Sequence, residues 1–356
     1  MGPGLANIKE RLDRALVNTR WTEIFPRALL KHFPSNSSDH IPIVLFTEGE
    51  EGCRPRPFKF EEIWTREEAS NLVVENAWRL KVPGSPMFRL CTKIKQAKLE
   101  LKQWNRSCFG NVQSKIKEAW KNLDQIQSLD PNPQNLEKEA NLCMEIQELL
   151  KREEILWRQK SKIKSLTSSD LNTRFFYLST VIRQRRNSID FMKKENGEWI
   201  SGWEEIGQCF QSFFNNLFSS STPDIPYDLN NLIPRCITPE DNEMLLAMPS
   251  MEEIKTTVFS MDSHKALGPD GMSPLFFKHY WHLIGGDVVD VVLSFFRGDC
   301  MLKEINHTFI TLIPKHERAA MVNQFRPISL CNVLYKIISK LLANRVRPLL
   351  HKMISP

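Results

Sequence analysis

The sequence predicts an α+β protein in which helix predominates. Apolar residues recur at three- and four-residue steps over residues 88–165, the spacing of one face of a helix. Residues 41–46 and 309–313 are instead short apolar runs typical of β-strands. The chain has 356 residues, enough for two or three domains. Its 41% hydrophobic and 25% charged residues are ordinary for a globular protein.

Residues 1–46 are expected to be the end of a folded unit, without the segments against which this end would pack. Apolar residues precede Trp21 and Phe25, and the strand-like run Ile41-Pro-Ile-Val-Leu-Phe46 follows them. A piece this short cannot bury a sizeable core by itself. The next residues are acidic and then rich in Gly and Pro, so residues 47–87 are assigned to a linker.

Residues 88–165 are expected to form a long helical hairpin. One apolar stripe joins Ile94, Ala97, Leu101, Trp104, Ile116, Trp120, Leu123 and Ile126. The sequence Asp130-Pro-Asn-Pro133 interrupts it, and a second stripe starts at Leu136 and extends to Leu156 or beyond. Two long helices joined by a tight Pro turn predict an antiparallel pair. We interpret the stripe as packing surface rather than as a binding site.

Residues 166–237 combine a basic segment, a turn at Gly197 and an aromatic helix over residues 206–218. Residues 219–238 are polar and Pro-rich, typical of a loop. The last region, 238–356, alternates helical patterns with the strand at 309–313. It ends in a basic amphipathic helix over residues 334–351.

Charge is concentrated in two blocks, although the net charge is only +6. Residues 151–186 hold ten Lys and Arg against three Asp and Glu, and residues 303–352 hold nine against two. Such blocks indicate contact with a polyanion, although long helices also carry solvated Lys and Arg. In the first block, Arg183, Arg185 and Arg186 share a segment with the aromatic residues 175–177, and Arg suits both phosphate contact and base stacking. We expect these three arginines to contact nucleic acid.

The eight cysteines are scattered and contain no Cys-x-x-Cys pair, which argues against a zinc site and against a disulfide framework. No apolar run approaches the length of a membrane helix, and the first residues lack a signal peptide's apolar core. We expect an intracellular protein of the nucleus or cytoplasm that does not contact membrane.

Two motifs near the end carry the clearest chemistry. Lys265-Ala-Leu-Gly-Pro-Asp-Gly271 is a turn in which Gly268 and Gly271 are free to take positive φ, and Asp270 is expected to cap the backbone. Thr311-Leu-Ile-Pro-Lys315 and Phe325-Arg-Pro-Ile-Ser329 place a strand ending in Lys315 before an element opened by Arg326. Two cations at the adjoining ends of two such elements suit the binding of a triphosphate.

The triplet Ser38-Asp39-His40 is the candidate site at the other end of the chain. A carboxylate beside a histidine can hold the imidazole proton needed for phosphodiester hydrolysis. A loop cap is the commoner role for such a triplet, so the motif alone is weak.

Together these motifs resemble the polyprotein of non-LTR (LINE-type) retrotransposons, and plant elements in particular. The segments Asp170-Leu-Asn-Thr-Arg-Phe-Phe-Tyr-Leu-Ser179 and Asn196-Gly-Glu-Trp-Ile200 add to the resemblance. The first 46 residues resemble the C-terminal end of the endonuclease/exonuclease/phosphatase domain, and residues 255–356 resemble the fingers of the reverse transcriptase. Leu267, where the family usually has Pro, is a departure.

The resemblance implies roles for particular residues. Asp39 and His40 match catalytic positions of the endonuclease, while Lys315 and Arg326 match the residues that grip the incoming dNTP. The intact family uses Mg²⁺, but the other metal-binding carboxylates have no counterpart here, so no productive Mg²⁺ site is expected.

The chain is expected to be a reverse transcriptase fragment without polymerase activity, because the resemblance implies that the palm aspartates, which bind two metal ions, come later than Pro356. Asp287 and Asp290 do not replace them. Two alternatives stay open: a residual module that binds RNA or DNA, and a helical interaction protein built on residues 88–165. The oligomeric state is also open.

Overall fold

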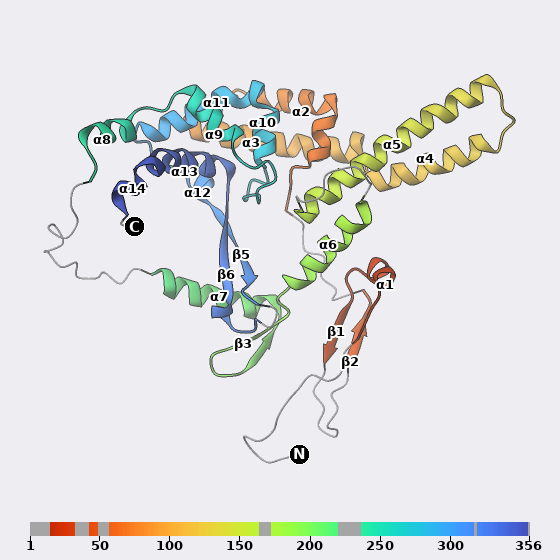
Figure 1. Ribbon diagram of the computed structural model, residues 1–356, viewed down its shortest axis with the longest axis horizontal. Coiled ribbons are helices and arrows are strands. Elements are labelled where there is room, and N and C mark those ends of the chain that lie inside the picture. Colours follow the sequence, from red (N-terminus) through yellow and green to blue (C-terminus); the bar gives the residue numbers. More distant parts are fainter. Residues whose placement is uncertain are drawn as a thin grey trace, which may run out of the picture.

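The computed structural model describes residues 15–32, 43–48, 57–163, 172–219, 236–316 and 319–354. Within these ranges the chain is mostly helical, and its strands form three separate two-stranded antiparallel ribbons. The expected α+β, mostly helical class is therefore confirmed. A long helical arm projects from one end of a layer of helices, and a β-hairpin descends from beneath the layer (Figure 1).

The helical layer forms the main core. It consists of η2 (Glu62–Arg66), α2 (Glu68–Trp78), α3 (Pro86–Trp104), α9 (Met251–Phe259), α10 (Pro274–His279), α11 (Trp281–Phe296), α12 (Lys303–Asn306) and α13 (Val333–Val346). The elements α8 (Pro239–Leu246), η6 (Arg347–Leu349) and α14 (Leu350–Met353) lie at its edge. The basic helix expected over residues 334–351 is thus α13 followed by two short turns.

Aromatic side chains fill the centre of this core. The ring centroids of Phe60 and Phe276 lie 5.4 Å apart, and those of Phe276 and Tyr280 lie 5.1 Å apart. The Tyr280 hydroxyl donates to Ser70 Oγ at 2.8 Å, which satisfies both buried hydroxyl groups. Phe60 and Ser70 lie in the stretch assigned to a linker. That assignment is wrong for residues 57–87, which supply η2, α2 and part of the core.

The helical path is interrupted between α3 and the next helix, α4 (Val112–Gln127). A π-helical turn, η3 (Asn105–Phe109), is followed by Gly110 at φ 72°, a left-handed conformation that favours glycine. The expected single stripe is therefore divided. Leu101 packs in the main core, whereas Leu123 packs in the arm.

The arm is an antiparallel pair of α4 and α5 (Pro133–Ser161), as expected (Figure 1). The Asn132 side chain accepts from the amide of Asn135 at 2.8 Å, and Pro133 takes the first helical position, so α5 starts at the expected Pro turn. The arm has a small core of its own, formed by the buried residues Ala119, Leu123, Ile146 and Leu149.

The remaining elements surround α6 (Thr173–Arg186), which packs along α5. At the N-terminal side lie α1 (Thr19–Ile24), β1 (Leu29–His32) and β2 (Ile43–Phe46). After α6 come β3 (Phe191–Lys193), β4 (Trp199–Ser201) and α7 (Trp203–Phe218), with the expected turn at Gly197, whose φ is 88°. The last ribbon joins β5 (Thr308–Pro314) to β6 (Phe325–Cys331), and β5 confirms the strand expected at 309–313. Most of the loop expected at 219–238 lies outside the described residues.

In the described ranges, no helix combines the length and the apolar character required to cross a membrane.

Candidate functional site

The β5–β6 hairpin brings Lys315 and Arg326 together at its end. Ile313 pairs with Arg326 in the antiparallel register, and the amide of Lys315 donates to the carbonyl of Gln324 at 2.9 Å. Residues two apart on a strand share a face, and directly paired residues share a face. Lys315 and Arg326 are therefore diagonal neighbours on one face, and both are exposed.

The opposite face of the hairpin end is anchored on α7. Phe325 is only 4% exposed, and its ring meets that of Phe210 edge-on at 5.3 Å. Because side chains alternate along a strand, burying Phe325 turns the neighbouring Arg326 outward. The anchor thus fixes which way the arginine points.

The loop between the strands is pinned by one glutamine. Gln324 Oε1 accepts from the amides of Ala320 and Met321 at 2.7 and 3.1 Å. Lys315 Nζ donates to the carbonyl of Asn323 at 2.7 Å. An ammonium has three donors, so this bond leaves Lys315 two for a ligand.

The base of the hairpin joins the Gly-Pro-Asp-Gly turn. Gly271 takes φ 76°, and its carbonyl accepts from the amide of Phe60 at 2.9 Å. Gly268 does not take positive φ, but a Cβ there would lie 2.5 Å from the backbone nitrogen of Asn332. It is needed for close approach to α13 rather than for its backbone angle.

Asp270 caps this turn, as the sequence predicts. Its Oδ1 accepts from the amide of Met272 at 3.0 Å. Burial raises the pKa of the Asp270 carboxyl to about 6, although Lys336 and Lys98 oppose the shift. A carboxyl used to hold a turn is not a ready metal ligand.

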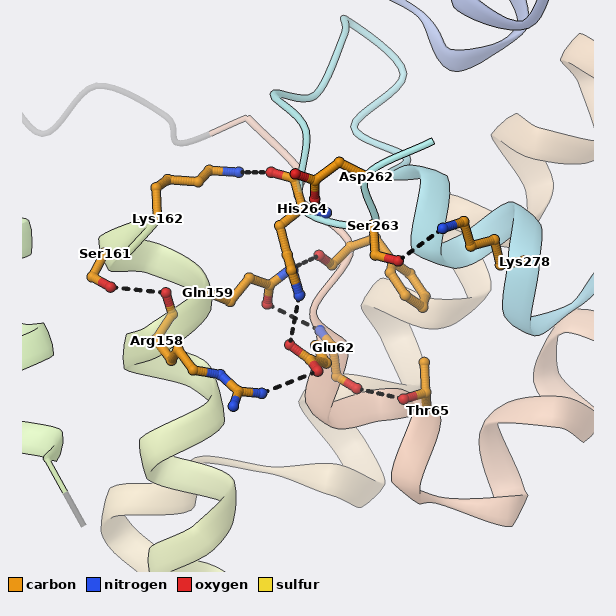
Figure 2. A network of polar contacts seen from close by, with 11 residues as sticks. Glu62, Thr65, Arg158, Gln159, Ser161, Lys162, Asp262, Ser263, His264 and Lys278 are labelled. Atoms are coloured by element: carbon orange, nitrogen blue, oxygen red, sulfur yellow. Dashed lines mark hydrogen bonds and ion pairs between the residues drawn. The ribbon is translucent and has the colours of Figure 1, made fainter. Parts of the chain in front are cut away.

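A polar network ties this region to the end of α5 (Figure 2). Glu62 of η2 lies 3.5 Å from Arg158 NH2 and 3.6 Å from His264 Nε2. Gln159 donates to the carbonyl of Phe60 at 2.9 Å and accepts from the amide of Glu62 at 3.0 Å. These contacts fix η2 against the end of α5, about 100 residues later in the chain, and against the loop at His264, about 200 residues later.

Lysine ammonium groups surround the loop over residues 260–266. They come from α5's end, α10 and α13 and donate to loop carbonyls: Lys162 to His264 at 2.6 Å, Lys336 to Ala266 at 2.6 Å, Lys340 to Ser260 at 3.1 Å, and Lys278 to Met261. Burial lowers the pKa of Lys162, Lys278 and Lys336. Each ammonium still has further donors for another acceptor.

The three arginines expected to contact nucleic acid are not one free patch. Arg183 donates to the carbonyls of Ser161 and Lys160 and so caps the end of α5. Arg185 NH2 donates to the carbonyl of Phe25 at 2.9 Å and holds the N-terminal ribbon. Two of the three guanidinium groups thus bond protein backbone, and the nucleic-acid contact expected of all three stays a prediction. Arg186 is exposed on the same helix, and its predicted role stays a prediction.

The endonuclease candidates Asp39 and His40 lie outside the described residues. Within the described ranges, no three His, Cys, Asp or Glu side chains gather to hold a metal ion, so no Mg²⁺ site can be assigned there. Asp287 accepts from Trp78 Nε1 at 2.7 Å and from Lys93 Nζ at 2.8 Å. It is a half-buried anchor between α11, α2 and α3.

Sequence reasoning missed Gln324, Asn332 and Glu62, which position the site. Gln324 directly precedes and Asn332 directly follows the segment Phe325–Cys331, yet a single polar residue has no periodic signal. The usable hint was their placement at the two ends of a strand, where amide side chains commonly satisfy open backbone groups.

Comparison with known proteins gives one informative similarity. No family model matches the chain. Over 199 residues, 55% of this chain, it is 27% identical to the Transposon TX1 uncharacterized 149 kDa protein of Xenopus laevis. The chain spans 15% of that protein's length.

Proposed function

We propose that this chain derives from a LINE-type retrotransposon polyprotein and forms the nucleotide-contacting fingers of its reverse transcriptase. The distant similarity to a transposon protein supports the origin. The observation that carries the activity is the exposed pair of Lys315 and Arg326 on one face of a hairpin end. The geometry suits a polyphosphate, since Lys supplies a compact charge and Arg a planar fork.

In this proposal the protein's own groups do the binding. The ammonium of Lys315 and the guanidinium of Arg326 neutralise phosphate oxygens of the incoming dNTP, while Phe325 and Gln324 hold the two cations in place. Mg²⁺ would accompany the triphosphate in the intact enzyme family, and its carboxylate ligands are not assigned to residues of this chain.

The test is titration of the protein with a fluorescent dNTP in the presence of Mg²⁺. Lys315→Ala and Arg326→Ala are each expected to weaken binding by about tenfold or more, the value of one charge-assisted contact. Lys303→Ala, which removes an exposed lysine on α12, serves as the matched control. Equal affinity of the wild type and both hairpin variants would contradict the proposal.

A second candidate function is sequence-independent binding of RNA. The lysine ammonium groups around residues 260–266 favour it, because several cations gather on one short loop. RNA affinity is then expected to fall steeply as salt rises. Lys340→Ala is expected to reduce the salt slope by about one, with Lys303→Ala as control. A slope that Lys340→Ala leaves unchanged would exclude this loop as the contact.

A further inference from the structure

A pocket of about 360 Å³ lies on the α7 side of the hairpin end. Its walls come from the β3–β4 turn, from α7 and from η5 (Val322–Gln324), and the cluster around Phe210 and Phe325 packs behind it. The volume falls within the ~300–1,000 Å³ typical of small-ligand sites. Because Phe325 faces α7, the pocket and the Arg326 side chain lie on opposite faces of β6.

Hydrogen bonds hold the pocket walls together. The amide of Lys193 in β3 donates to the carbonyl of Ala320 at 2.8 Å, which joins the turn to the hairpin loop. The side chain of Lys194 lies 3.0 Å from Glu205 and so ties the turn to α7. Gln324 fixes the third wall through its bonds to the hairpin loop. The pocket is therefore bounded by braced segments rather than by separate loops.

The lining offers a particular set of polar groups. Asn216, Asn323 and Ser212 line the pocket, and within the described part of the chain their side chains have no hydrogen-bond partner. Asn196 differs, because its side chain bonds Glu198. Each carboxamide combines a donor with an acceptor, which is what a nucleobase edge requires.

Two further lining residues carry groups that a nucleotide can use. Phe213 supplies an aromatic ring, on which a base can stack. Lys193 supplies an ammonium, which forms no ion pair among the described residues and can receive a phosphate.

We propose that this pocket binds a single nucleotide unit, with its base between Phe213 and the carboxamides of Asn216 and Asn323, and its phosphate at Lys193. Such a unit can be a free mononucleotide or an unpaired nucleotide of a strand. The site is separate from the proposed dNTP contact. The two meet at Asn323, which lines the pocket and whose carbonyl accepts from Lys315 Nζ.

Cys209 provides the readout, because its half-buried thiol lines the pocket. The protein is alkylated with iodoacetamide, and modification of each cysteine is followed by peptide mass spectrometry. AMP, CMP, inorganic phosphate and a short oligonucleotide are added in separate arms. Exposed Cys300 is the internal control.

At a ligand concentration ten times its dissociation constant, alkylation of Cys209 is expected to slow about tenfold while that of Cys300 does not change. Protection by AMP or CMP identifies a free nucleotide, and protection by the oligonucleotide alone identifies a strand. Asn216→Ala is expected to abolish protection, whereas Asn215→Ala, an adjacent exposed asparagine outside the pocket wall, is expected to retain it.

Three results would overturn the proposal: no protection by any nucleotide or oligonucleotide, equal protection by inorganic phosphate alone, or full protection in Asn216→Ala. Lys315→Ala separates this site from the dNTP contact. It is expected to lose dNTP affinity and to keep nucleotide protection of Cys209.

Discussion

The side chain of Asn332 accepts a hydrogen bond from the backbone amide of Asp270, 62 residues earlier in the chain, at 3.1 Å. Its Nδ2 donates to the carbonyl of Glu304 at 2.7 Å. One buried amide thus joins the Gly-Pro-Asp-Gly turn, α12 and the start of α13, and so sets the base from which the hairpin extends.

Asn332→Ala is expected to lower the free energy of unfolding by about 2–3 kcal/mol, because it leaves buried backbone groups without partners. Urea denaturation followed by circular dichroism measures the loss. Asn306→Ala, on the exposed side of α12, is the control and is expected to change stability by less than about 0.5 kcal/mol. Matching denaturation midpoints for the two variants would show that the Asn332 bonds do not stabilise the fold.

Two glycine substitutions are expected to act in opposite directions. Gly271→Ala forces a side chain onto φ 76°, and its Cβ would lie 2.3 Å from the carbonyl oxygen of Phe58, so it should destabilise strongly. Gly286→Ala, in the exposed middle of α11 with open space around it, should stabilise by about 0.5–1 kcal/mol. Thermal unfolding of both proteins checks the pair, and a stable Gly271→Ala would contradict the turn geometry.

Asp270 is expected to make the fold less stable as pH rises. Burial raises its folded pKa to about 6 from an ordinary value of 3.8. The folded state therefore holds the proton more tightly than the unfolded state. The stabilisation is present below about pH 4 and is lost as pH rises to about 6.

The measurement is the difference in unfolding free energy between the wild type and Asp270→Asn at pH 4.5 and pH 7. Asparagine keeps an oxygen for the Met272 amide but does not titrate. From pH 4.5 to pH 7, the unfolding free energy of Asp270→Asn is expected to rise relative to that of the wild type. A constant difference would mean that the Asp270 pKa is not raised.

Arg185→Ala is expected to loosen the N-terminal ribbon rather than to weaken nucleic-acid binding. The arginine bonds the carbonyls of Phe25 and Pro26, so its loss should speed hydrogen exchange over residues 19–32. Arg297→Ala, at an exposed helix end, is the control. If Arg185→Ala instead reduces RNA affinity and leaves hydrogen exchange unchanged, the result would support the nucleic-acid contact that the sequence predicts.

Local patterns predicted the helical arm and β5, because the arm has a periodic apolar stripe and β5 is a short apolar run. They did not predict the break at Gly110. The stripe on α3 continues in register with that on α4, and what separates them is packing of α3 against α11, nearly two hundred residues away. A sequence shows that a residue can be buried, but not which partner buries it.

The same limit applies to the site. Lys315 and Arg326 come together because of strand register, which the sequence signals through two apolar runs around a polar loop. Arg183 and Arg185 lie in a basic segment typical of nucleic-acid contact, but in the fold each guanidinium donates to backbone carbonyls. Composition does not reveal whether a guanidinium faces solvent or caps a helix.

The α4–α5 arm has its own consequence for how the chain can vary in length. Beyond the pairing of Arg66 with Glu148, its two helices project away from the helical layer (Figure 1). Adding about seven residues to each helix would extend the arm by ~10 Å while the apolar repeat between them stays in phase. The tip is therefore where insertions and deletions can accumulate, and the reach of the arm can change without repacking the core.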